Sequence, residues 1–366
     1  MGVSKVTCAG FVGAIAGIGL LLGLAACGSS TSDSSTGKGG GAVAVEAGVV
    51  DAGSSGVCES GATTACSSFI TPTGTMIQLG PSGAVMEPNV GTGFENPLGM
   101  GDGPDGGGPY CATFAEIFNQ SPKLTEQLLN TNQDGIDLNF ALYTVYRPAT
   151  WPTGPVPVIT WGNGTCAQPE GYGALLRYVA SYGFFVIAAN SREVGTGADM
   201  LHALDYAAAA NADSTSPYYK KLDMTRVGAM GHSQGGGATV SVASDSRIKD
   251  IIIFNAADTA PKPYLAISGD MDITGFTASG MSQAIDGQSE PAAYIFYHMV
   301  PDTGNLNGHL TLMLQPQRVT GPTVAWWKMV FENDPASTSQ FVGANCGLCG
   351  MASEFEYGEH GLEGGD

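Results

Sequence analysis

A single serine stands among glycines in residues 227–240, VGAMGHSQGGGATV, where an apolar run passes into a stretch with helical character. The stretch matches the pattern G-x-S-x-G, with Gly231 and Gly235 two positions to either side of Ser233. A sharp turn from a strand into a helix strains the serine backbone, and only small neighbours avoid the adjoining elements. The pattern therefore predicts a tight turn that exposes Ser233 beside the free amides of a helix, where negative charge is favoured. An idle serine in a glycine-rich turn is the alternative.

The rest of the chain past about residue 109 alternates apolar runs with amphipathic stretches, separated by Gly, Pro and Asn. We expect strands at residues 139–146, 156–161, 184–189, 227–230, 251–254, 264–268 and 292–297, and helices at 172–181, 198–210, 234–243 and 324–331. Strands that alternate with such helices form parallel β-α-β units. This order predicts an α/β fold with a mostly parallel central sheet, helices on both faces, and reactive groups at the carboxyl ends of the strands.

The first 27 residues read as an export signal. Lys5 precedes an apolar run over residues 9–26 that is too short for a comfortable membrane span. The sequence LAACGSS at residues 24–30 resembles a bacterial lipobox, in which Cys27 becomes the lipidated N-terminus. An ordinary secretory signal cut near Ala26 is the alternative, and both predict an exported protein, either an outer-membrane lipoprotein or an extracellular one.

Residues 28–108 are predicted to be a flexible tether followed by a poorly ordered approach to the folded part. Gly, Ser, Thr and Ala dominate its first 40 or so positions, and such a composition buries too little apolar surface to offset the entropy of ordering. A domain of catalytic size is expected over residues 109–366.

The formal net charge of −19 restricts the partners of the chain. Nucleic acid and anionic lipid surfaces would repel it, so neither is expected as a partner. We expect a monomer that acts on a neutral substrate and meets a membrane only through a lipid at Cys27.

Six of the 8 cysteines remain once Cys8 in the signal and Cys27 are set aside. An even number in an exported protein predicts disulfides. Our preferred pairing, one of about 15, is Cys58 with Cys66, Cys346 with Cys349, and Cys111 with Cys166. The CxxC at 346–349 could instead be redox-active or half of a zinc site, but the sequence has no second CxxC and a structural bridge is favoured.

A serine hydroxyl becomes a nucleophile when a base removes its proton and a carboxylate holds that base in one tautomer. After a serine turn of this kind the acid comes next along the chain and the histidine last. The predicted strand 264–268 ends at Gly-Asp-Met-Asp, which supplies Asp270 and Asp272 at its carboxyl end.

Position selects His309 among the 5 histidines. His202 precedes the serine, His232 lies inside the turn, and His360 is in an acidic tail. His298 sits at the end of a predicted strand, where a structural role is expected, whereas His309 lies in the loop that follows the same strand.

Two backbone amides are needed to stabilise an oxyanion, one from the residue after the serine and one from the loop after an earlier strand. Gln234 supplies the first. Asn163, in the sequence Trp-Gly-Asn-Gly-Thr at 161–165, is the expected second donor, and a plain Asn-Gly turn is the alternative.

These residues bring a family into view: from about Tyr143 to Cys349 the chain resembles the bacterial polyesterase and cutinase branch of the α/β-hydrolases, which includes polyethylene-terephthalate hydrolases. The resemblance rests on residues 158–163, 183–187, 229–237, 269–272, 324–328 and 332–334 and on the cysteines at 346 and 349. It implies the α/β-hydrolase fold and cleavage of carboxylic esters through an acyl-serine, with no metal or organic cofactor. It also implies that Asp272, rather than Asp270, orients His309.

Two departures from the family pattern favour short-chain esters or aliphatic polyesters as substrates. Gly162–Asn163 replaces Gly-Tyr, which removes an aromatic clamp, and no tryptophan follows residues 255–258. The alternatives are a lipase or peptidase of the same fold, or a non-catalytic binding lipoprotein on this scaffold. No long apolar insertion suited to a lipase lid is evident.

Residues 130–137, NTNQDGID, imitate the opening of a calcium loop, with oxygen-bearing side chains at alternate positions and glycine at the sixth. The twelfth position is Ala141 rather than Glu. We therefore expect a polar turn here and no metal site.

Overall fold

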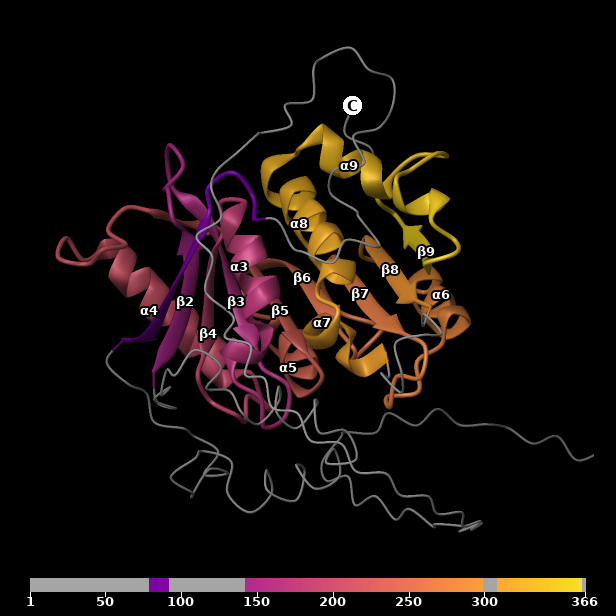
Figure 1. Cartoon of the computed structure of the whole chain (residues 1–366), viewed down its shortest axis with the longest axis horizontal. Coiled ribbons are helices and arrows are strands. Elements are labelled where there is room, and N and C mark those ends of the chain that lie inside the picture. Colours follow the sequence, from indigo (N-terminus) through magenta and orange to yellow (C-terminus); the bar gives the residue numbers. More distant parts are fainter. Residues whose placement is uncertain (1–78, 92–141, 299–307, 364–366) are drawn as a thin grey trace, which may run out of the picture. The chain divides into compact units, whose positions relative to one another are not determined.

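A computed structural model describes residues 79–91, 142–298 and 308–363, and its central feature is one sheet of nine strands (Figure 1). The strands are β1 Ala84–Val90, β2 Tyr143–Pro148, β3 Val156–Gly162, β4 Phe185–Ala189, β5 Leu222–His232, β6 Ile248–Phe254, β7 Tyr264–Gly269, β8 Ala292–Tyr297 and β9 Phe355–His360. Their order across the sheet is β1-β2-β4-β3-β5-β6-β7-β8-β9.

The centre of the sheet is parallel and its edges are antiparallel. Strands β4, β3, β5, β6, β7 and β8 pair in parallel, whereas β1 and β2 at one edge and β9 at the other pair antiparallel. The carboxyl ends of the parallel strands therefore meet at one edge, where this fold class places its reactive groups.

Helices cover both faces of the sheet. The helices longer than one turn are α3 Gly173–Ser181, α4 Ala198–Ala212, α5 Gln234–Val242, α6 Ala278–Asp286, α8 Gln317–Glu332 and α9 Pro335–Phe341. Helices α4, α5 and α6 pack on one face, and α3, α8 and α9 on the other, where α3 and α8 lie side by side in Figure 1. The predicted α/β fold with a mostly parallel sheet is confirmed.

Side chains along each strand point alternately to the two faces of the sheet, so the core consists of two clusters, one on each face. In β6, Ile251 and Ile253 join the cluster under α5, while Ile252 and Phe254 join the cluster under α8. All four side chains are fully buried, as expected for strands covered on both faces.

The two outermost strands lie outside the predicted set. β1 was expected to belong to the approach before residue 109, and β9 to an acidic tail, so the sheet begins earlier than the predicted domain. Both strands are only partly buried, and β1 contains Pro88 and Glu87. Edge strands tolerate Pro and charge and lack an apolar run, so periodicity did not identify them. Helix α8 begins at Gln317 rather than Val324 and continues through Pro322.

Among residues 79–91, 142–298 and 308–363, no helix has the length and apolar character needed to cross a membrane. The predicted signal at 1–27, most of the predicted tether and the calcium-like stretch at 130–137 lie outside the described residues.

Candidate active site

The turn between β5 and α5 has the strained geometry that the glycine pattern predicts. Ser233 adopts φ 55° and ψ −118°, a positive φ that side-chain-bearing residues rarely adopt. A Cβ on Gly231 would collide with the carbonyl oxygen of Gly235, and a Cβ on Gly235 would collide with that of Gly162. The glycines are therefore required because the turn packs backbone against backbone, and not merely because it bends.

His309 lies within hydrogen-bond distance of the serine. It belongs to a short 3₁₀ helix, η4 Gly308–Leu310, and its Nε2 is 2.9 Å from Oγ of Ser233. The imidazole is only 4% exposed. The structure thus brings together two groups that stand 76 positions apart in the sequence.

Asp272 completes the arrangement from the turn after β7. Its Oδ1 is 2.8 Å from Nδ1 of His309. Its Oδ2 accepts hydrogen bonds of 2.6 Å from the amide of Asn255 and from the hydroxyl of Ser268. Burial opposes ionisation, but the hydrogen bonds from His309, Ser268 and Asn255 outweigh it and keep the pKa of Asp272 below its usual range.

An ionised Asp272 fixes the tautomer of the base. A carboxylate only accepts hydrogen bonds, so Nδ1 of His309 carries the hydrogen and Nε2 is left as the acceptor. The hydroxyl of Ser233 then donates to Nε2, which is the arrangement required for removing the serine proton.

The second acid and the competing histidine form a separate pair. Asp270 lies 3.5 Å from Nδ1 of His298, and both side chains are substantially exposed, at 43% and 33%. Glu356 lies 3.8 Å from the other ring nitrogen of His298. The structure therefore aligns Asp272 and His309 with the serine, whereas Asp270, His298 and Glu356 form a separate group.

Gln234 begins α5, so its backbone amide lies in the first turn of the helix, where amides have no partner within the helix. Its side chain is held by two neighbours from the loop after β4. The amide nitrogen donates to Glu193 at 2.5 Å, and the amide oxygen accepts from the backbone of Val194 at 3.1 Å. Burial raises the pKa of Glu193, while the bond from Gln234 opposes this rise.

Asn163 is fully buried, and its side chain already has partners. Its amide nitrogen donates to the carbonyl oxygens of Ala189 and Ser191 at 2.7 and 2.9 Å, and its oxygen accepts from the indole of Trp161 at 2.9 Å. The side chain thus fixes the loop after β3. Only the backbone amide of Asn163 is left for an oxyanion.

Sequence reasoning did not identify three polar side chains around the site. Asn255 follows β6 with φ 55°, and Ser268 lies near the end of β7. His232 was assigned only to the turn, yet both of its ring nitrogens lie at hydrogen-bond distance from other groups, Tyr172 Oη at 3.0 Å and the carbonyl oxygen of His309 at 2.7 Å. The available signal was positional: each stands at or next to the carboxyl end of a parallel strand.

Two exposed apolar side chains flank the acid. Met271 is 68% exposed and Ile273 is 61% exposed, and they stand immediately before and after Asp272. They place apolar side chains directly before and after Asp272, whose carboxylate contacts His309.

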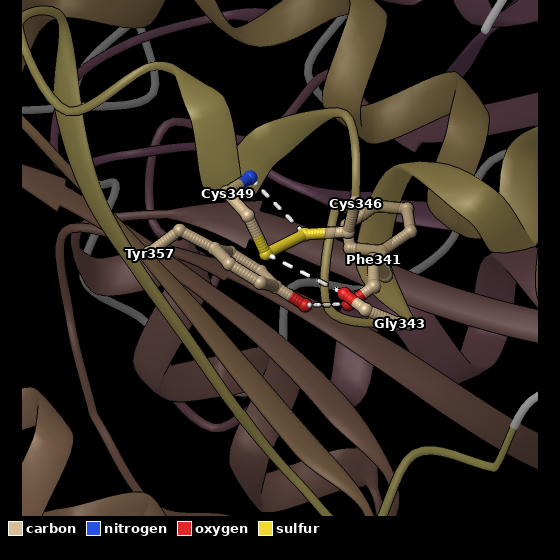
Figure 2. Close-up of a disulfide and its surroundings, with 5 residues drawn as sticks. All are labelled: Phe341, Gly343, Cys346, Cys349 and Tyr357. Atoms are coloured by element: carbon tan, nitrogen blue, oxygen red, sulfur yellow. Dashed lines mark hydrogen bonds between the residues drawn. A yellow bond between two sulfur atoms is a disulfide. The ribbon is translucent and has the colours of Figure 1, made fainter.

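The disulfide predicted between Cys346 and Cys349 is present (Figure 2). It lies between α9 and β9, where the hydroxyl of Tyr357 also donates to the carbonyl oxygen of Phe341 at 2.6 Å. Cys166 is disulfide-bonded as well. Its predicted partner Cys111 and the predicted pair 58–66 lie outside the described residues.

In the described part of the chain, no group of three or more His, Cys, Asp or Glu side chains is placed to hold a metal ion.

Comparison with known proteins shows the family to which this chain belongs. Residues 139–353 match the PETase family, described as PET hydrolase-like. The chain is also similar to Cutinase est1 of Thermobifida alba, with 25% identity over 277 residues that cover 67% of this chain and 87% of the relative. The family match spans more than half of the chain, including the serine turn, the acid turn and His309. The family resemblance inferred from the sequence is thereby confirmed, and the chain belongs to the PET hydrolase-like family of α/β-hydrolases.

Proposed function

We propose that this chain is a serine hydrolase that cleaves carboxylic esters through an acyl-serine intermediate. The observation that carries the proposal is the continuous line of hydrogen bonds from Ser233 through His309 to Asp272, with distances of 2.9 and 2.8 Å. Membership of a PET hydrolase-like family and the similarity to a cutinase support an ester as the substrate.

In the proposed reaction, Oγ of Ser233 attacks the ester carbonyl carbon while Nε2 of His309 takes the serine proton. The tetrahedral intermediate collapses when the imidazolium returns that proton to the leaving alcohol oxygen, and the acyl group stays on Ser233. Water, deprotonated by the same imidazole, then attacks the acyl carbon. The acyl–Oγ bond breaks as the imidazolium returns this proton to Oγ of Ser233, which releases the acid and restores the free serine. Asp272 remains ionised throughout and stabilises the imidazolium.

The negative charge on the carbonyl oxygen needs donors that stand ready before the reaction. We assign them to the backbone amides of Gln234 and Asn163. Support for Gln234 comes from its place at the head of α5 and from the clamp on its side chain by Glu193 and Val194. Support for Asn163 comes from three side-chain hydrogen bonds that hold its loop still.

The substrate class is a neutral ester with an apolar acyl part. Met271 and Ile273 offer apolar surface beside the acid, and a net charge of −19 disfavours anionic substrates. Short-chain esters and aliphatic polyesters fit these features, and we place them ahead of aromatic polyesters.

The test is hydrolysis of p-nitrophenyl esters of increasing acyl length, together with release of soluble products from an aliphatic and an aromatic polyester film. Ser233→Ala is the matched control and should abolish turnover. Preference for peptides or for long emulsified acyl chains would favour the peptidase or lipase alternative. Failure of a fluorophosphonate to label Ser233 in the folded parent would favour a non-catalytic binding protein.

We also propose export, with lipid attachment at Cys27 supported by the lipobox-like sequence at residues 24–30. Metabolic labelling with a fatty acid should mark the parent and not Cys27→Ala. Secretion of an unlabelled parent would indicate an ordinary signal cleaved near Ala26.

A further inference from the structure

The imidazole of His232 is bonded on both sides inside the protein. Nε2 is 2.7 Å from the carbonyl oxygen of His309, and Nδ1 is 3.0 Å from the hydroxyl oxygen of Tyr172. That hydroxyl in turn accepts a hydrogen bond of 2.9 Å from the backbone amide of Gly164. The side chains of Tyr172 and His232 are buried, with 1% and 2% exposure.

The donor and the acceptor can be assigned in each hydrogen bond between His309, His232 and Tyr172. A carbonyl oxygen can only accept, so Nε2 of His232 carries a hydrogen and donates it to His309. In a neutral imidazole Nδ1 is then the acceptor, and the hydroxyl of Tyr172 donates to it. Burial, together with the nearby His309, lowers the pKa of His232 to about 3, so the ring stays neutral in solutions near neutral pH.

The loop after β3 has room for this line only because residue 164 is glycine. A Cβ on Gly164 would lie 2.8 Å from Nδ1 of His232 and 2.8 Å from the hydroxyl of Tyr172. Tyr172 also packs on Trp161 of β3, with ring centroids 4.8 Å apart. The chain from the loop to His232 is thus closely packed as well as hydrogen-bonded.

His232 connects Ser233 and His309, the two reacting groups. It precedes Ser233 in the sequence, and its side chain holds the backbone of His309, whose ring faces Ser233. The imidazole rings of His232 and His309 are also in contact, with centroids 4.8 Å apart. The distance between nucleophile and base therefore depends on a bond made by the residue next to the nucleophile.

We infer that His232 is a positioning residue for the proposed ester hydrolysis: as a neutral imidazole of fixed tautomer, it sets the backbone of His309 relative to Ser233 and ties it, through Tyr172, to the loop that carries Asn163 and Gly164. This inference rests on the proposed function.

Two substitutions of His232 test its two hydrogen bonds one at a time. In His232→Gln the amide nitrogen is as many bonds from Cα as Nε2, so a donor toward His309 is retained. In His232→Asn the amide stands where Nδ1 stood, so contact with Tyr172 is retained and the donor toward His309 is lost. We expect His232→Asn to lower kcat by about 10- to 100-fold, because misplacement of a reacting group by about 1 Å costs on that order. His232→Gln should lose less than about 5-fold by the same argument.

The measurement is kcat and KM for a p-nitrophenyl ester, with near-UV circular dichroism to verify the fold of each variant. KM should stay within about 2-fold, because the bond acts on the base and not on substrate binding. Tyr172→Phe removes the far end of the line and should lower kcat by a few fold. Combined with His232→Gln it should cost less than the product of the two single losses, since both break the same link. His298→Gln is the control and should retain full activity.

Equal losses in the Gln and Asn variants, losses confined to KM, or normal kcat with only a lower melting temperature would each overturn the inference. These results differ from failure of the proposed function. In that case the parent itself would not hydrolyse the ester.

Discussion

The backbone amide of Gly308 donates a hydrogen bond of 2.7 Å to the carbonyl oxygen of Asp270. This contact places the residue before His309 directly on the turn that carries Asp272. A second bond reinforces it, since the amide of Asn255 donates to the carbonyl oxygen of Gly308 at 3.1 Å. The base and the acid are therefore aligned by one main-chain hydrogen bond and by the side chain of Asn255, in addition to the bond between their own side chains.

The first prediction follows from the closeness of that contact. A Cβ on Gly308 would lie 2.5 Å from the carbonyl carbon of Gly269 and 2.6 Å from the oxygen of Asp270. Gly308→Ala should therefore push His309 away from Asp272 and lower kcat for an ester by about 100-fold. Gly350→Ala, where a Cβ would meet open space, is the control. Parent-like kcat in a folded Gly308→Ala protein would contradict the prediction.

The two acids of the turn after β7 should differ sharply in their effect on turnover. Asp272→Asn leaves His309 without the acceptor that fixes its tautomer, and kcat should fall by about 10⁴-fold. Asp270→Asn alters a side chain that faces His298 and is 43% exposed, so activity should remain near that of the parent. Steady-state kinetics on one ester decides between them. A larger loss in the Asp270 variant would show that the acid has been misassigned.

Neighbouring glycines in α5 should respond in opposite directions to the same change. A Cβ on Gly236 would lie 2.5 Å from Cβ of Ala256 and 3.0 Å from the carbonyl oxygen of Phe254, so Gly236→Ala should lower the free energy of unfolding by about 1 to 3 kcal/mol. A Cβ on Gly237 would meet nothing within 4 Å. Gly237→Ala should raise the free energy by about 0.5 to 1 kcal/mol, because alanine loses less entropy in a helix. Urea unfolding of both variants tests the pair, and equal signs would refute it.

Asp199 on α4 predicts a pH-dependent change in stability. Burial raises its pKa from 3.8 to about 6, against opposing effects of Ser191 and His202, and its Oδ2 has no hydrogen-bond partner. Between those two values the folded state holds a proton that the unfolded state has released, so the stability contributed by this group falls as pH rises.

Asp199→Asn removes the titration. Its free energy of unfolding relative to the parent should therefore rise by about 1 to 3 kcal/mol between about pH 4 and about pH 7. Thermal or urea unfolding at the two pH values measures the difference. Asp205→Asn on the same helix is the control, because that side chain is 63% exposed and should show no comparable rise. A difference between Asp199→Asn and the parent that stays constant with pH would count against a buried, titrating carboxylate.

The parts of this fold that follow from local pattern were predictable. Strands such as β6 are continuous apolar runs, which indicate buried strands. The glycines around Ser233 indicate the tight turn, because a turn of this kind leaves no room for larger side chains at those positions. His309 could be selected because chain order and loop position leave few candidates. Position at the carboxyl end of a strand marks Asn255 and Ser268 as candidates, but it does not identify their partner, because their contact with Asp272 depends on β6 and β7 being neighbours in space.

The hydrogen bond between Tyr172 and His232 could not be predicted from the sequence either. Nothing in the spacing of 60 positions between them indicates contact, and a histidine inside a serine turn offers several directions for its ring. Asn163 illustrates the same limit at shorter range. The sequence suggested that its loop supplies an amide. Two of the three bonds made by its side chain, to the carbonyl oxygens of Ala189 and Ser191, depend on β4 lying beside β3.

Strand β1 has a practical consequence for anyone who shortens this protein. Its residues pair with β2 along most of their length, and Glu87 forms an ion pair with Arg147 at 2.6 Å. A chain trimmed to begin at residue 109, where the core pattern starts, would leave the outer side of β2 with unpaired amides and carbonyls. An unprotected edge of that kind recruits strands from other molecules, so such a truncation should precipitate where a chain that keeps residues 79–91 stays dispersed.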